Sequence, residues 1–374
     1  RTVPITSLPL RGQGSLAARL SQLKIKQGLS MPNIRSFLHV SNAIALAAIM
    51  VALSGCSSGS GGSRAEGEDR KRPSRDQEVL DGAAAESITR AEMHRAEGDL
   101  NAALAEFERA IEVNPDLTVA YLGAGDIYRE KGDYPEAERR YAKAAEVEPQ
   151  NFDAQYKHGL TLQLLNRVTD AVRAYLRALS IRPEDFEANL NLATAYLQLQ
   201  EPGQALPYAQ RAVRLNPSSG PARVNLGSVY AAMNRHAEAV TEYLQAAEQM
   251  ELSSELLLNL ADSYGKTERY AEMLATLEQL VARNPSAIAY ERLGFARFRV
   301  KDYDPALASF QSALAIDPNH YPALNGVGVC MLNRYLWSDR KDRAALENAM
   351  SALKRSLQIQ PNQPRIVELV TRYG

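Results

Sequence analysis

Bulky, small and proline positions recur along the chain with a period of 34 residues from about residue 84 onwards. Bulky positions at this spacing are Tyr128, Leu162, Tyr196, Tyr230 and Tyr264. Prolines at the same spacing are Pro115, Pro149, Pro183 and Pro217, and Pro285, Pro318 and Pro361 follow further along the chain. This pattern predicts units of two amphipathic helices joined by a short turn, each closed by a proline that cannot continue the second helix.

Small residues mark the places where the two helices of a unit approach closely. In the first helices these are Gly125, Gly159, Ala193, Gly227, Ala261, Gly294 and Gly328. In the second helices they are Ala103, Ala137, Ala171, Ala205 and Ala239, with the bulky Phe107, Tyr141, Tyr175 and Tyr243 filling the gaps. The turn between helices needs a residue that tolerates the left-handed conformation, and the candidates are Gly98, Gly132, Asn166 and Asn234.

The second unit carries the residues Tyr121, Gly125, Tyr128, Gly132, Ala137, Tyr141, Ala144 and Pro149. In period and residue type this unit resembles the tetratricopeptide repeat. The resemblance implies an all-α fold, a right-handed superhelical solenoid of about eight repeats over 84–361. The expected repeats are 84–117, 118–151, 152–185, 186–219, 220–253, 254–286, 287–320 and 321–361. Residues 362–374 are expected to form a helix that caps the last repeat.

The last unit departs from the period, because Pro318 and Pro361 are 43 residues apart. We expect the extra residues between its two helices, around 333–343, where the only tryptophan, Trp337, lies. Trp337 is interpreted either as a binding hot spot or as a plug that holds the inserted loop on the last repeat.

The N-terminal part of the chain has a different character. The first methionine is Met31, and residues 1–30 are interpreted as an upstream extension that is not part of the real protein. After Arg35, an apolar run from Ala43 to Leu53 is shorter than the ~20 residues that a membrane span requires. We therefore predict a secretory signal peptide over residues 31–55.

The four residues Leu53, Ser54, Gly55 and Cys56 resemble a bacterial lipobox. This resemblance implies cleavage before Cys56 and lipid attachment to its thiol; the alternative is a chance match with an unmodified thiol. Ser57 is not the aspartate that retains enterobacterial lipoproteins at the inner membrane. The expected location is thus the bacterial cell envelope, with the outer membrane favoured over the inner.

Residues 56–83 begin with a stretch rich in glycine, serine and mixed charge, which predicts a flexible tether. The basic run at 70–72 could touch anionic lipid headgroups, but nearby acidic residues favour a solvated linker.

Composition and motif spacing argue against catalysis, metal binding and nucleic-acid binding. The formal net charge is −1, whereas a phosphate-tracking surface needs an excess of lysine and arginine. The four histidines after the predicted signal peptide have no metal-ligand spacing, namely His94, His158, His236 and His320, and no phosphate loop occurs. Cys330 is interpreted as a small buried residue. We expect no catalytic residue, metal, cofactor, nucleic acid or small-molecule substrate.

By family resemblance, the concave groove is lined by positions two, five, six, nine and twelve to thirteen of each repeat. These positions hold an apolar set that predicts a protein-binding groove, namely Tyr156, Leu160, Leu190, Leu197, Phe295 and Phe298. Acidic residues occupy the second position in several units, as Asp153 and Glu187 do, so the two-carboxylate clamp of chaperone-binding repeats is not expected.

Asparagine recurs at the sixth position in Asn191, Asn225 and Asn259. An amide offers both a donor and an acceptor, so this ladder is a candidate site for the backbone of an extended peptide. The alternative is contact with the turn or with a neighbouring helix.

These features predict a non-catalytic, lipid-anchored scaffold that captures other proteins, and assembly of a pilus, secretion or peptidoglycan machinery is the expected setting. The alternatives are a non-catalytic subunit of a glycan-modifying or other envelope enzyme complex, or a cytoplasmic scaffold if the signal peptide is not real. Fold alone does not identify the partner.

Overall fold

A computed structural model of the chain describes the backbone of residues 75–374 and the side chains from residue 82 onwards. These residues form one compact unit, Arg75–Gly374. The predicted extension 1–30, the signal peptide 31–55, Cys56 and residues 57–74 lie outside the described residues.

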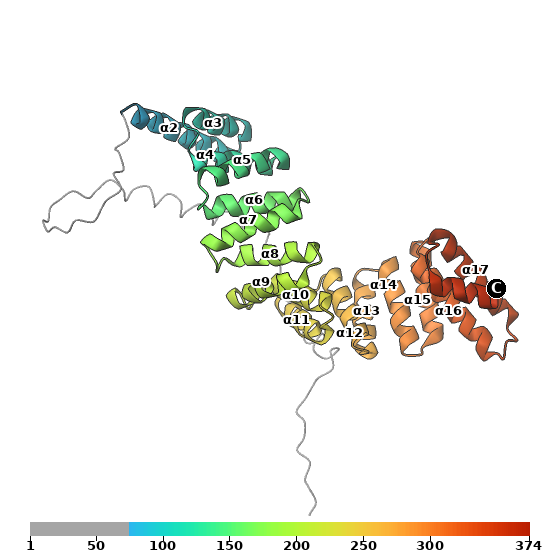
Figure 1. Ribbon diagram of the computed structural model, residues 1–374. Coiled ribbons are helices and arrows are strands. Elements are labelled where there is room, and N and C mark those ends of the chain that lie inside the picture. Colours follow the sequence, from blue (N-terminus) through green and yellow to red (C-terminus); the bar gives the residue numbers. More distant parts are fainter. Residues whose placement is uncertain (1–74) are drawn as a thin grey trace, which may run out of the picture. The chain divides into compact units, whose positions relative to one another are not determined.

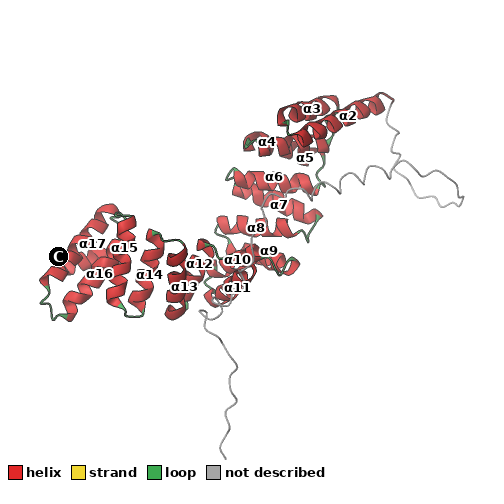
Figure 2. Cartoon of the chain, turned by 180° about the vertical axis from the view of Figure 1, so that it is seen from behind, coloured by secondary structure: helices red, strands yellow, loops and turns green. Residues whose placement is uncertain are grey.

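The described chain consists of helices and loops, without strands (Figure 2). The first four pairs are α2 (Arg75–Glu97) and α3 (Leu100–Val113), α4 (Thr118–Glu130) and α5 (Tyr134–Val147), α6 (Phe152–Leu164) and α7 (Val168–Ile181), α8 (Phe186–Gln198) and α9 (Pro202–Leu215). The next four are α10 (Gly220–Ala232) and α11 (His236–Gln249), α12 (Ser254–Lys266) and α13 (Tyr270–Arg283), α14 (Ala287–Arg299) and α15 (Tyr303–Ile316), α16 (Tyr321–Trp337) and α17 (Arg343–Ile359). The last helix is α18 (Pro364–Tyr373).

Successive helices pack in chain order, as Figure 1 shows. The two helices of each pair contact each other, and the second helix of one pair packs on the first helix of the next. First helices of successive pairs also touch in most of the row, so they form a common inner layer. The predicted all-α repeat solenoid of eight units with a C-terminal capping helix is confirmed.

Close packing within each pair depends on a small residue facing a large one. A Cβ atom added to Gly125, Gly159 or Gly227 would lie 2.7, 2.8 or 2.6 Å from the tyrosine ring opposite. These rings belong to Tyr141, Tyr175 and Tyr243, which are almost fully buried. Glycine is needed at these positions because the rings occupy the space that a Cβ atom would take.

The turns adopt the left-handed conformation that the sequence predicts. Gly98 and Gly132 have φ values of 84° and 78°, and Asn166 and Asn234 both have 59°. Other residues at the same place in the remaining units also have positive φ, namely Gln200, Glu268 and Lys301. The repeat geometry therefore imposes this conformation even where the residue does not favour it.

Five of the first helices begin after a side chain that accepts a hydrogen bond from the backbone N–H three residues on. These caps are Asn151, Asp185, Ser219, Ser253 and Ser286. Each satisfies one of the N–H groups that have no partner inside the helix. The caps fix where these five first helices start, and with it which of their residues reach the inner face.

The N-terminal boundary of the repeats differs from the expected one. α2 begins at Arg75 rather than near residue 84, so residues 75–83, predicted as part of the tether, are helical. The segment contains no proline, and the strong helix formers Ala83, Ala84 and Ala85 follow Gly82 directly, so the helix runs through the glycine into the repeat.

The extra residues of the last unit do not form a long loop between its helices, as the sequence analysis expected. α16 and α17 each contain 17 residues, compared with 13 and 14 in the preceding pair. The additional turn of α16 buries Tyr335, which packs with Leu332 and Leu353 beside residues of α18. Burial of this apolar side chain stabilises the longer helix.

No helix in residues 75–374 is long and apolar enough to cross a bilayer.

Candidate binding groove

The apolar residues predicted to line the groove lie on the first helices, but they differ in accessibility. Tyr156 and Leu160 of α6 and Leu190 and Leu197 of α8 are half-buried. The Tyr156 ring stacks on Phe152 with 5.7 Å between ring centroids. Burial, and secondarily Glu187 and Asp185, raises the pKa of Tyr156 to about 12, so its phenol stays protonated. These side chains offer a surface without formal charge.

Two of the three ladder asparagines bind the preceding repeat. Asn191 donates through Nδ2 to the hydroxyl oxygen of Tyr156 at 2.9 Å. Asn225 donates through Nδ2 to Oγ1 of Thr194 at 2.8 Å, and its Oδ1 atom is buried without a hydrogen-bond partner. These amide N–H groups therefore serve the contact between repeats, which is the alternative that the sequence analysis left open.

Side chains at the sixth position of other repeats also contact the preceding repeat. In three places they interact with the side chain at its ninth position: Lys157 with Asp126 at 2.7 Å, Asn225 with Thr194 at 2.8 Å, and Arg292 with Asp262 at 3.6 Å. The residue types differ, but each pair joins a donor to an oxygen acceptor across the same helix interface. The linkage thus belongs to the stacking of repeats.

Asn259, the third asparagine, makes no side-chain hydrogen bond within the described residues. It lines a cavity of about 600 Å³ between α12 and α14, to which the end of α10 and residues of the second helices α11 and α13 also contribute. α12 and α14 contact each other less than other neighbouring first helices from α4 to α16 do. The cavity opens where this inner layer is loosest.

We call the surface made by Asn259, Asp262, Lys266, Arg292, Phe295 and Arg299 the cationic section. We call the surface made by Tyr156, Leu160, Leu190, Asn191, Leu197 and Asn225 the uncharged section.

In the cationic section, Lys266 is exposed and lies within ion-pair distance of no carboxylate in the described chain. Arg299 likewise has no carboxylate partner among these residues; it donates to the phenol of Tyr270 and lies 4.5 Å from the centroid of that ring. The ion pair of Arg292 with Asp262 is longer than a hydrogen bond, and both side chains are over 40% exposed. Positive charge therefore exceeds negative charge around this cavity.

His236 borders the same cavity, and the charge of Lys266 affects its pKa. Burial, and secondarily Lys266, lowers the pKa of His236, and its Nδ1 atom is buried without a hydrogen-bond partner. The imidazole is thus kept neutral at physiological pH, and it adds no charge to the section.

The two phenylalanines predicted for the groove are not brought together. Phe295 is 41% exposed and lines the cationic cavity. Phe298 is half-buried and packs edge-on against Tyr303, with centroids 5.2 Å apart. Phe298 belongs to the contact between α14 and α15, whereas Phe295 is available to a ligand.

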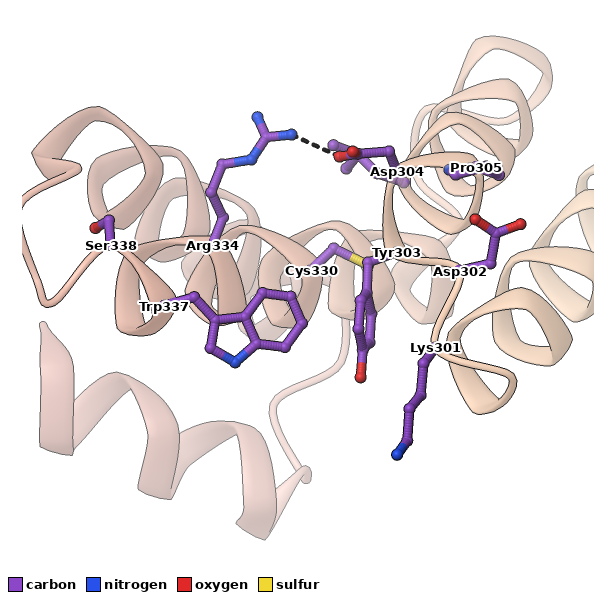
Figure 3. A pocket seen from close by; sticks show the side chains of 10 residues that line it. Lys301, Asp302, Tyr303, Asp304, Pro305, Cys330, Arg334, Trp337 and Ser338 are labelled. Carbon is purple, nitrogen blue, oxygen red and sulfur yellow. Dashed lines mark hydrogen bonds and ion pairs between the residues drawn. The ribbon is translucent and has the colours of Figure 1, made fainter.

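A second cavity, of about 520 Å³, lies between the start of α15 and the end of α16 (Figure 3). Trp337 is 61% exposed, and its ring stands edge-on to Tyr303 with centroids 4.5 Å apart. Arg334 and Asp304 form an ion pair of 2.7 Å at the rim. Trp337 lies in the last turn of α16 and packs on the preceding unit, so it does not plug an inserted loop.

The described residues offer little for catalysis or metal binding. Within residues 75–374, no group of three histidine, cysteine, aspartate or glutamate side chains is arranged to hold a metal ion. Burial raises the pKa of Cys330 to about 11, so its thiol is not a nucleophile at neutral pH. Nε2 of His158 lies 3.1 Å from Glu138, which makes this residue a partnered interior histidine.

Family models for the tetratricopeptide repeat match most of these helix pairs. The matches cover residues 94–161, 152–185, 190–251 and 258–321, together more than half of the chain. A search of curated proteins gave no match.

Solved structures of several repeat proteins are similar to this chain. A tetratricopeptide repeat protein from Parabacteroides merdae is 20% identical, with 67% of this chain and 99% of the other covered and a TM-score of 0.48. PilF of Pseudomonas aeruginosa is 20% identical, with 57% and 97% covered and a TM-score of 0.47. YrrB, a repeat protein with an unusual peptide-binding site, is 23% identical, with 53% and 98% covered and a TM-score of 0.44.

Proposed function

Because the chain is built of tetratricopeptide repeats, we propose that it is a non-catalytic scaffold that binds other proteins through the inner face of its repeats. The observation that carries this proposal is the cavity of about 600 Å³ between the first helices α12 and α14, with residues of α11 and α13 at its side, which combines an exposed aromatic ring with polar side chains that have unused donors. Concave surfaces of this composition are the usual places where proteins bind ligands.

The bound partner is an extended protein segment. The uncharged section supplies half-buried apolar side chains, and the cationic section supplies the amide of Asn259 and the ring of Phe295. An amide can bond both the N–H and the C=O of a peptide group, and exposed rings supply apolar area for its side chains.

A crosslinking experiment tests whether the inner face is the binding surface. Benzoylphenylalanine replaces Phe295 in the full-length chain, and a matched variant carries it at Leu176, which is 37% exposed on the second helix α7. We expect partner proteins to be crosslinked from position 295 and not from position 176. Equal crosslinking from both positions would argue against an inner binding face.

We further propose that the scaffold is anchored by lipid at Cys56 in the bacterial cell envelope, with the outer membrane favoured. The support is the apolar run 43–53 followed directly by Leu53-Ser54-Gly55-Cys56. Two or more acyl chains give stable membrane attachment, because each buried CH₂ contributes ~0.8 kcal/mol. Such an anchor would concentrate a partner at the membrane during assembly of a pilus, secretion or peptidoglycan machine.

The anchor is tested by replacing each cysteine in turn. We expect Cys56→Ala to move the protein from the membrane fraction to the soluble fraction and to abolish palmitate labelling. Cys330→Ala is the matched control, because it removes a buried thiol and leaves Cys56 in place. Retention of Cys56→Ala in the membrane would exclude lipid at this residue as the anchor.

A further inference from the structure

We propose that the cationic section binds an acidic side chain of the partner, and that the partner is therefore an extended segment in which aspartate or glutamate stands next to an apolar residue. This inference rests on the proposed binding of protein segments in the groove, and it adds the chemical identity of the segment.

The first observation is uncompensated positive charge. Lys266 and Arg299 come from the last turns of α12 and α14, and both face the same cavity. Neither has a carboxylate partner among the described residues, although Arg299 is oriented by its contact with Tyr270. A guanidinium held against an aromatic ring is pre-organised to bind a planar carboxylate, so it loses little freedom when the ligand arrives.

The second observation is the balance of the whole lining. Lys266, Arg292 and Arg299 contribute three positive charges, and Asp262 is the only carboxylate that lines the cavity among the described residues. The Asp262 carboxylate lies 3.6 Å from Arg292, and Glu291, which does not line the cavity, lies 3.5 Å from the same guanidinium, so Lys266 and Arg299 carry the uncompensated positive charge. A ligand that carries negative charge therefore complements this cavity, whereas a basic segment would be repelled.

The third observation is the free amide of Asn259. Asn191 and Asn225 donate their amide N–H groups to hydroxyl oxygens of the preceding repeat, at 2.9 and 2.8 Å. Asn259 makes no such bond within the described chain. It lines the same cavity as the two cations. The amide can therefore bond the backbone beside the acidic residue.

The fourth observation sets the neighbouring residue of the ligand. Phe295 is 41% exposed, and it lines the cavity from α14, one helical turn before Arg299. Residues four apart lie on one face of a helix, so an apolar ligand side chain on Phe295 stands beside a carboxylate on Arg299. The arrangement also differs from a clamp built on the second and fifth positions, which here hold Glu255, Leu258, Ile288 and Glu291.

The test uses a phage library of random twelve-residue peptides selected on the purified full-length chain. We expect enrichment of peptides with aspartate or glutamate next to an apolar residue. Affinity of an enriched peptide, measured by fluorescence anisotropy, should fall about tenfold or more in Lys266→Ser/Arg299→Gln, because charge-assisted hydrogen bonds are lost. It should also fall as salt rises.

The matched control is Arg214→Ser/Arg365→Gln, which removes two exposed arginines outside the inner layer. We expect this control to bind the peptide as the unaltered chain does. Thermal unfolding of all variants checks that the fold is retained. A charge-reversed chain, Lys266→Glu/Arg299→Glu, should bind the same peptide only after its acidic residue is changed to lysine, which a purely structural effect would not produce.

The outcomes separate the two proposals. If no peptide is enriched on the unaltered chain, the groove does not bind peptide segments, and both the proposed function and this inference fall. If enriched peptides lack an acidic preference and bind Lys266→Ser/Arg299→Gln unchanged, the proposed function stands and the acidic partner is overturned.

Discussion

The uncharged and cationic sections lie on different repeats. They share the sixth repeat position, but their polar groups at this position have different roles. In the uncharged section, Asn191 and Asn225 are bound to the preceding unit at 2.9 and 2.8 Å. In the cationic section, the corresponding Asn259 is unbonded within the described residues, and Lys266 has no acidic partner there. The comparison teaches that the same residue type holds repeats together in one place and is available to a ligand in another.

The packing beneath the two sections is partly different. In α6 and α10, Gly159 and Gly227 lie against the rings of Tyr175 and Tyr243. In α12 of the cationic section, Ala261 takes the place of glycine and the buried Leu277 takes the place of tyrosine, whereas a Cβ atom added to Gly294 of α14 would lie 2.8 Å from the Phe310 ring. Close packing of a glycine on a ring therefore occurs beneath both sections, and α12 lacks it.

The largest expected contrast comes from one substitution made in both sections. Gly159→Ala should destabilise the fold by about 1–3 kcal/mol, because its Cβ would lie 2.8 Å from the Tyr175 ring in a filled core. Gly265 lines the cationic cavity, and the atom nearest to an added Cβ there is Sδ of Met273 at 3.1 Å, at the end of an unbranched side chain that can adjust. The matched substitution is Gly265→Ala. It should stabilise α12 by about 0.5 kcal/mol through helix propensity.

Chemical denaturation of both variants measures these changes in the free energy of unfolding. A loss of similar size in Gly265→Ala would show that the two sections are packed equally tightly.

The second contrast compares the asparagines themselves. Asn225→Ala should cost about 1 kcal/mol, because it removes the 2.8 Å bond to Thr194 from a buried interface. Asn259→Ala should change stability by less than about 0.5 kcal/mol, as surface substitutions without partners do. Urea unfolding of the two variants measures both changes in the free energy of unfolding. Equal losses would mean that Asn259 also holds repeats together, and the ladder would then be structural throughout.

A third contrast uses acid. Burial lowers the pKa of His158, beneath the uncharged section, and the interaction with Glu138 only partly opposes this. Between the depressed pKa of the folded state and the unfolded value of about 6.5, the unfolded chain binds more protons. Stability therefore falls as pH drops below about 6.5. We expect His158→Gln to lose less stability than the unaltered chain between pH 7 and 5, as measured by thermal unfolding. An unchanged pH dependence would rule out this histidine as its source.

The smallest contrast concerns Glu291, which contacts Arg292 in the cationic section at 3.5 Å. Its effect on stability has the opposite pH dependence to that of His158. Burial raises the pKa of Glu291, with Arg292 opposing. Holding this carboxylate ionised therefore costs stability above the folded-state pKa, and the cost disappears below the unfolded value near 4.5. Glu291→Gln should be slightly more stable than the unaltered chain at pH 7 and equally stable near pH 4. Glu347→Gln, on an exposed residue of α17, is the control and should change neither value.

Most of the fold follows from local sequence. The 34-residue period, the small positions facing bulky ones and the left-handed turns at Gly98 and Asn166 all appear in the structure. They could be predicted because each depends on residues close together in one helical hairpin. Gln200, Glu268 and Lys301 also adopt positive φ; their residue types give no such signal, but their place in the repeat does.

The site could be predicted only as a list of residues on one face. The sequence placed Asn191, Asn225 and Asn259 at equal positions, and it treated Phe295 and Phe298 alike. Tertiary structure distinguishes the asparagines, because the hydrogen-bond partners of Asn191 and Asn225 come from the preceding repeat, 35 and 31 residues earlier in the chain. Asn259 has no such bond within the described residues, although α12 contacts the preceding first helix α10 as α8 contacts α6. Sequence thus determined which side chains face inward, and the individual side-chain contacts between repeats decided which of them remain available to a partner.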